Sequence, residues 1–210
     1  MRKFLITAIA FLIPVSAIFA AEKNLPNWSV STQKTFDAVA NIFGAEKFKN
    51  LKIEIFTDET APRALAGANI LKLQTRVLSD PKLAQLLTHE LAHVFDLGFY
   101  RGNSRGEKSE FVDGATPIFA DDLSVQFYRI SWKNSAEKLG NASVLDFVSG
   151  YAASDPFEDF AESVTFFVFK NRDFQKMAAG NDALSAKFKF IKNNVFGGKV
   201  FDSGDGEIQT

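Results

Sequence analysis

The hydrophobic positions change their spacing along the chain, and that spacing predicts the secondary structure. Between residues 33 and 43, apolar side chains recur at helical intervals, and the run stops at Gly44, which predicts a helix with a glycine cap. Apolar and polar residues alternate from 51 to 55, which predicts a half-buried strand. Residues 68–77 are predicted to form a second strand.

Two aspartates that each precede a proline predict the starts of two longer helices. An N-cap followed by proline at the first helical position is a typical helix start. Asp80 opens a helix that is expected to run past His93 and to end near Gly98, in a left-handed cap. Asp155 opens a helix that is expected to continue through Phe169.

The remaining segments complete an α+β pattern. The polar, glycine-bearing residues 100–116 predict a mobile loop, residues 119–132 an amphipathic helix, and residues 183–194 a last helix. Residues 201–210 are expected to be a disordered tail. Strands come first and helices dominate afterwards, so residues 21–200 are predicted to form one α+β domain. Its expected architecture is a small N-terminal sheet with the Asp80 helix, followed by a mostly helical part.

Residues 1–20 have the pattern of a secretory signal peptide. Arg2 and Lys3 precede an apolar run over residues 4–19, and the small residue Ala20 marks the expected cleavage point. An uncleaved membrane anchor is the alternative, but the run is shorter than the roughly 20 apolar residues that span a bilayer. The sequence therefore predicts an exported protein, periplasmic or extracellular, without stable membrane insertion.

Composition narrows the classes of function. The formal net charge of −1 argues against a nucleic-acid partner, which requires a basic face. The chain contains no cysteine, so its stability depends on packing, and on a metal if one is bound. Its 23 phenylalanines predict a core that is unusually rich in aromatic rings.

The segment His89-Glu-Leu-Ala-His93 predicts a metal site on the Asp80 helix. Two histidines four positions apart project from one helical face and can bind one ion, while Glu90 is placed to take a proton from water. An ordinary surface helix with two histidines is the alternative. These are the only histidines in the chain, and both occupy the spacing that zinc chemistry requires.

With no cysteine and no further histidine, the third metal ligand is expected to be a carboxylate. Glu158 and Glu162 lie four apart on the helix that Asp155 opens, so one can bind the metal while the other bonds a histidine ring. The spacing from Asp155 to Glu158 also fits a capping box, and ligand and cap remain equally good interpretations of Glu158. Asp159 is the nearest rival ligand.

These segments resemble the catalytic pattern of the anthrax lethal factor-like gluzincins, which include the secreted Pro-Pro endopeptidases and the Mlc-titration-factor peptidases. The resemblance covers residues 80–169 and rests on His89-Glu-Leu-Ala-His93-Val-Phe-Asp96, Tyr151 and Glu158-Asp-Phe-Ala-Glu162. The interval between His93 and Glu158 is longer than in the toxin-like and Pro-Pro members. The resemblance therefore implies no particular substrate.

The resemblance implies a zincin-like fold and a role for each motif residue. One Zn²⁺ ion would be bound by His89, His93 and Glu158. Glu90 would be the general base and Tyr151 would stabilise the oxyanion, a role that suits a phenol beside a tetrahedral intermediate. Glu162 and Asp96 would not bind the metal but would hydrogen-bond the residues that do, and so hold them in position. The strand at 68–77 would be the edge strand that pairs with substrate.

Together, the motif and the resemblance predict an exported zinc endopeptidase with a protein or peptide substrate. Zinc-activated water would attack the peptide carbonyl, with Glu90 as general base. The alternative is a catalytically silent metal-binding or adhesion protein of the cell envelope. The presence of Glu90 favours the enzyme, because a silent relative need not retain it.

Overall fold

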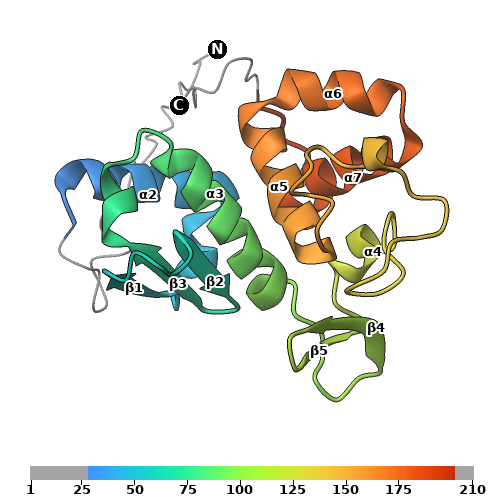
Figure 1. Cartoon of the computed structure of the whole chain (residues 1–210), viewed down its shortest axis with the longest axis horizontal. Helices are drawn as coiled ribbons and strands as arrows, with labels where there is room; N and C mark the ends of the chain where they lie inside the picture. The colour runs from blue at the N-terminus through green and yellow to red at the C-terminus, as the bar shows by residue number, and fades with distance from the viewer. Residues whose placement is uncertain (1–27, 202–210) are drawn as a thin grey trace, which may run out of the picture.

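The computed structural model describes residues 28–201, which form an α+β structure (Figure 1). The strands are β1 (Lys52–Phe56), β2 (Ala64–Gly67), β3 (Ile70–Gln74), β4 (Lys108–Asp113) and β5 (Thr116–Phe119). The α-helices are α2 (Val30–Phe43), α3 (Leu83–Val94), α4 (Val125–Tyr128), α5 (Pro156–Phe169), α6 (Asn171–Ala179) and α7 (Asp182–Phe190). The predicted α+β class is confirmed.

The first three strands form a sheet in the order β1-β3-β2. β3 runs parallel to β1 and antiparallel to β2, so β3 is the central strand. The prediction that the strand at 68–77 is the edge strand is therefore wrong, and β2 occupies that edge. The strand also ends earlier than predicted, because Thr75–Ser79 form a 3₁₀ turn. The pattern missed β2 because its four residues, Ala-Leu-Ala-Gly, do not alternate as a half-buried strand does.

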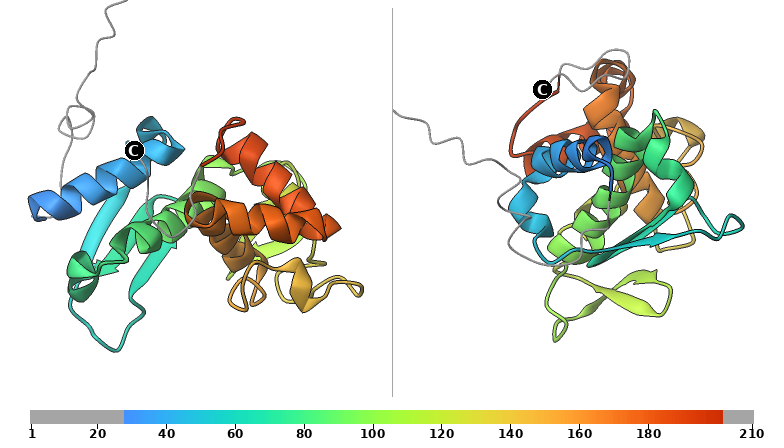
Figure 2. Two further views of the ribbon diagram at one scale, coloured as in Figure 1. Left: turned by 90° about the horizontal axis from the view of Figure 1, so that it is seen from above. Right: turned by 90° about the vertical axis from the view of Figure 1, so that its left-hand side faces the viewer.

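Helices α2 and α3 pack against each other, and α3 packs on β2 and β3 (Figures 1 and 2). The predicted helix at 33–43 is confirmed as α2, whose Phe36, Val39 and Phe43 are buried. It ends at Gly44, where φ is 95°, a conformation that favours glycine. This core is rich in aromatic rings, as the composition predicts.

Both ends of α3 differ from the prediction. The Asp80 carboxylate accepts a hydrogen bond from the Lys82 amide at 2.7 Å, and the regular helix begins only at Leu83. At the other end, Phe95–Phe99 continue α3 as a π-helical turn, and Gly98 does not adopt the predicted left-handed conformation. Gly98 is needed for a different reason, since a Cβ there would lie 2.1 Å from the carbonyl oxygen of Ala68.

The middle of the chain departs most from the sequence-based expectation. The predicted loop at 100–116 contains β4, which pairs with β5 in a hairpin that stands apart from the first sheet (Figures 1 and 2). The predicted helix at 119–132 is reduced to the single turn α4. Phe111 of the hairpin packs on Tyr128 with ring centroids 5.0 Å apart. The apolar pattern correctly marked buried residues, but they pack on a hairpin instead of following one helix.

The C-terminal part is helical, as predicted. α5 has the predicted bounds, with the Asp155 side chain accepting from the amides of Phe157 and Glu158 as N-cap. The predicted last helix is present as α7 and a following π-helical turn, Ile191–Val195. Helix α6 was not predicted.

Two predictions concern the ends of the chain. The signal peptide proposed for residues 1–20 lies outside the described residues. The tail proposed for 201–210 begins too early, because Phe201 packs on Phe196 with ring centroids 5.0 Å apart; the rest of that tail lies outside the described residues. Within residues 28–201, no helix combines the length and apolar character that crossing a bilayer requires.

Candidate metal centre and cleft

The predicted site residues converge between α3 and α5, which pack along each other through the middle of the molecule (Figure 1). His89 and His93 lie on the face of α3 that meets α5, as their spacing predicts. Glu158 and Glu162 lie on the opposing face of α5. The side chains of these four residues are largely buried, at 11–20% exposure.

Three donor atoms form a compact triangle. Nε2 of His89 lies 3.2 Å from Nε2 of His93, and Oε2 of Glu158 lies 3.0 Å from the first nitrogen and 3.5 Å from the second. Tetrahedral zinc with bonds of about 2.0–2.1 Å holds its ligand atoms roughly 3.3–3.4 Å apart. The three observed distances lie on both sides of this value, so the spacing of the donors is compatible with one bound metal ion.

The chemistry of the donors also fits a cation. Oε2 of Glu158 is buried and accepts no hydrogen bond from the described residues, although it faces two imidazole nitrogens. A buried carboxylate oxygen without a donor is costly unless a cation compensates it. His89, His93 and Glu158 are, within residues 28–201, the one group of three acidic or histidine side chains that could hold a metal ion.

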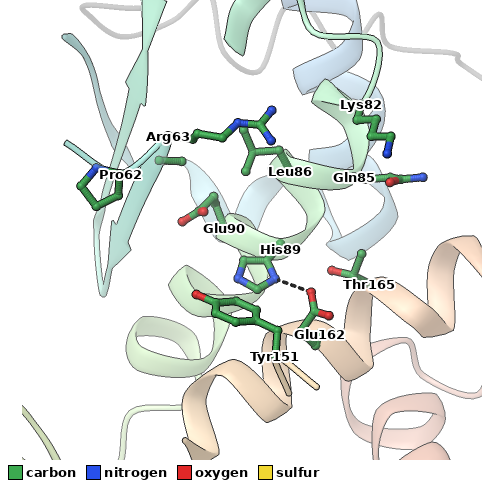
Figure 3. A pocket seen from close by; sticks show the side chains of 11 residues that line it. Pro62, Arg63, Lys82, Gln85, Leu86, His89, Glu90, Tyr151, Glu162 and Thr165 are labelled. Carbon is green, nitrogen blue, oxygen red and sulfur yellow. Dashed lines mark ion pairs between the residues drawn. The ribbon is translucent and has the colours of Figure 1, made fainter. Parts of the chain in front are cut away.

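Glu162 contacts the far side of the His89 ring (Figure 3). Its Oε1 lies 3.2 Å from Nδ1 of His89, and its Oε2 accepts a 2.7 Å hydrogen bond from the Ser149 hydroxyl. Burial alone would lower the pKa of His89, but the close contacts with the Glu158 and Glu162 carboxylates outweigh it and raise the pKa to about 9. Ser149 was not predicted, because no motif spacing links it to α5.

Glu90 is buried beside the donor triangle and lines the same cleft. It is not one of the three donors. Burial raises the pKa of the Glu90 carboxyl, and the neighbouring histidines oppose that rise. A carboxyl with a raised pKa is a stronger base than an ordinary glutamate, which suits it to accept a proton.

Tyr151 lies over the donors, at the mouth of the site. Its hydroxyl donates to Oε1 of Glu158 at 2.9 Å, and its ring is stacked on the His89 ring with centroids 6.0 Å apart. The side chain is 56% exposed, so it can contact a molecule that enters the cleft. Burial and the Glu158 carboxylate raise the pKa of Tyr151, which keeps its hydroxyl protonated as a hydrogen-bond donor.

Asp96 lies deeper, behind the histidines. Its Oδ2 accepts a short, 2.5 Å hydrogen bond from the Tyr128 hydroxyl. Burial raises the pKa of the Asp96 carboxyl to about 7, while the hydrogen bonds from Ser124 and Tyr128 and the charge of His93 act in the opposite direction. The structure therefore pairs Asp96 with α4, and its influence on His93 is electrostatic.

The geometry separates the two acidic candidates for the third ligand. Asp159 faces away from the histidines, and its Oδ2 contacts Nζ of Lys187 at 2.7 Å and Nε1 of Trp132 at 2.9 Å. Glu158 faces them. Asp155 caps α5 through its side chain, but the Glu158 side chain bonds Tyr151 and the histidines, so only half of the predicted capping box forms.

A cleft runs past these residues, between β2 and the two helices. One half has a volume of about 400 Å³ and the other about 320 Å³, and His89, Glu90 and Tyr151 line both halves. Ala64, on the edge strand β2, also lines both halves. The candidate metal centre is therefore open to a molecule lying along β2.

Comparison of the chain with known proteins identified no significant match. No protein-family model matches the chain, and no curated protein and no solved structure gives a significant match.

Proposed function

We propose that this protein is an exported, zinc-dependent endopeptidase of the gluzincin type, with a zincin-like fold. One observation carries the proposal: the donor atoms of His89, His93 and Glu158 meet at a spacing compatible with one bound metal ion, with Glu90 buried beside them in an open cleft. The resemblance to the lethal factor-like peptidases supports the same assignment of residues.

Bound zinc would supply Lewis-acid chemistry, making water more acidic and a peptide carbonyl more electrophilic. Glu90 would accept one proton as water adds to the carbonyl carbon, and would pass it to the amine nitrogen as the C–N bond breaks. Tyr151 would donate a hydrogen bond to the carbonyl oxygen as negative charge develops there. Its hydroxyl needs only to leave Glu158, to which it donates at 2.9 Å.

The edge strand β2 supports a peptide substrate in particular. A sheet edge presents unpaired backbone groups, and an extended peptide can add to it as a further strand. Ala64 and Ala66 of β2 line the cleft beside the metal centre. Their small side chains leave room for a peptide backbone to lie close to the site.

The test combines metal analysis with a cleavage assay on the mature chain. The wild-type protein should contain one zinc per chain and should cleave members of a peptide library. Glu90→Gln should retain zinc and lose at least about 100-fold in rate, as expected when a general base is removed. Glu137→Gln changes an exposed glutamate that pairs with Lys133 outside the cleft, and should have wild-type activity.

Other outcomes distinguish the alternatives. Zinc bound at one ion per chain without cleavage of any library member would favour the silent metal-binding protein. Glu158→Ala should lose most of the zinc, since it removes one of three protein ligands. If Glu158→Ala retained zinc fully, the proposed ligand set would be wrong.

A further inference from the structure

The two halves of the cleft extend in opposite directions from the catalytic centre. Lys82, immediately before α3, lines the first half together with Gln85 and Leu86 of α3 (Figure 3). His93 and Leu97 follow His89, and they line the second half. Because the five residues lie along one helical axis, the halves form one groove with His89 and Glu90 in its middle.

The groove is long enough for a short peptide. Lys82 and Leu97 are separated by roughly 20 Å along the helix axis, at about 1.5 Å per residue. An extended chain rises about 3.3 Å per residue, so this length holds about six residues. Both halves can therefore contact side chains of one bound peptide.

The first half carries the positive charge. Arg63 lines it but is tied in an ion pair to Asp80, which compensates its charge. Lys82 is exposed, and no ion-pair partner for it occurs within residues 28–201. Two acidic side chains also line this half, Glu162 and Glu90. Ser149 and His89 contact the carboxylate oxygens of Glu162, and Glu90 lines both halves, so it does not distinguish one half from the other. Lys82 is thus the available charge.

The second half combines apolar side chains with acidic ones. Leu65, Leu97 and Phe157 supply its apolar lining. Asp113, at the end of β4, is exposed and forms no ion pair with any described residue. Asp155 also lines this half, with its side chain bonded to the first amides of α5. Asp113 is the available charge here.

We propose that the cleft selects extended peptides by the order of their charges. An acidic side chain would bind on the Lys82 side of the catalytic centre, and a basic side chain on the Asp113 side. An apolar side chain would lie between them, against Leu97 and Phe157. This inference rests on the proposed peptidase function, since it assigns the substrate class of the same cleft.

The test compares two peptides that differ only in charge order. They are Asp-Asp-Ala-Leu-Ala-Lys-Lys and the reverse, Lys-Lys-Ala-Leu-Ala-Asp-Asp, both labelled and with blocked ends. Binding is measured by fluorescence anisotropy on the zinc-loaded mature Glu90→Gln chain, which holds the peptide without turnover. One order should bind about five-fold more tightly, the scale of exposed charge pairs. The preference should shrink as salt is raised.

Charge reversal of the cleft should invert the preference. In the Glu90→Gln background, Lys82→Glu combined with Asp113→Lys should bind the other peptide more tightly. The matched control, Asp173→Lys with Lys176→Glu, exchanges an exposed ion pair on α6 that does not line the cleft. It should keep the wild-type preference.

The outcomes separate the inference from the proposed function. Equal binding of the two peptides, no binding of either, or an unchanged preference after charge reversal would overturn the inference. Cleavage by the wild-type chain without any charge preference would do the same while leaving the peptidase function intact. Binding with the expected inversion but without cleavage would leave the inference standing and would contradict the peptidase function.

Discussion

The carboxylate of Glu162 lies 3.2 Å from Nδ1 of His89, on the side of the ring opposite to Nε2, which faces Glu158. A carboxylate in this position keeps the proton on Nδ1 and leaves the lone pair of Nε2 for a metal. Ser149 holds the other oxygen of Glu162 at 2.7 Å. The orientation of the His89 ring thus depends on Glu162 and Ser149, neither of which supplies a donor atom to the candidate metal site.

Glu162→Gln should lower zinc affinity about 10- to 100-fold, because outer partners of metal-bound histidines contribute on that scale. Ser149→Ala should lower it less, since Glu162 remains. Thr165→Ala is the matched control, one turn further along α5 in the same cleft, and should bind zinc normally. Competition against a chelating dye measures all three. Wild-type affinity in Glu162→Gln would contradict the role assigned to Glu162.

The buried ion pair between Asp159 and Lys187 makes a prediction about stability. Burial raises the pKa of Asp159 to about 6 and lowers that of Lys187, so each group depends on the other for its charge. Asp159→Asn leaves the lysine charge unpaired and should cost about 3–5 kcal/mol in the free energy of unfolding. Urea denaturation measures this cost.

Two further results check the same interpretation. Asp159→Asn with Lys187→Met removes both charges and should be more stable than the single variant by at least about 1 kcal/mol. Zinc content should remain unchanged in Asp159→Asn, because Asp159 faces away from the histidines. Loss of zinc in this variant would favour Asp159 as the third metal ligand.

The sequence predicted best where one local signal determines the structure. The Asp-Pro cap at the start of α5 and the apolar periodicity of α2 predicted the bounds of both helices to within a few residues. Capping and amphipathic spacing act over a few residues, so a short stretch of sequence contains the signal. It failed at the β4–β5 hairpin and at β2. Their strands are stabilised by pairing with distant segments, and the sequence does not encode that pairing locally.

The same distinction applies to the site. The i, i+4 spacing of His89 and His93 required only a helix to bring both rings to one face, so the sequence sufficed for them. The choice between Glu158 and Asp159 needed the orientation of α5, which turns Asp159 toward Lys187 of α7. Ser149 could not be found at all, because its contact with Glu162 depends on the loop before α5.

The pH dependence of stability should show the buried Asp96. Burial raises the pKa of Asp96 in the folded chain from the ordinary value of an aspartate, 3.8, to about 7. The folded state therefore holds a proton that the unfolded state releases, and stability falls as pH rises from about 4 to 7. Asp96→Asn should reduce this fall by more than about 1 kcal/mol between pH 4 and pH 7.5. Urea midpoints across this range measure it, and an identical fall in the variant would contradict the assignment.

Gly98 joins the end of α3 to the turn before β3, and a side chain there has no space. A Cβ would lie 2.1 Å from the Ala68 carbonyl oxygen, which belongs to the backbone and cannot turn away as a side chain can. Gly98→Ala must therefore move the helix end or the strand turn, at a cost of about 1–3 kcal/mol or more. Gly140→Ala is the control, because nothing lies within 4 Å of its added Cβ. Since β2 and α3 form two walls of the cleft, Gly98→Ala should also weaken peptide binding at temperatures where the chain remains folded. If Gly98→Ala and Gly140→Ala had equal thermal stability, the end of α3 and the turn before β3 would have room for a side chain at residue 98, which would contradict this prediction.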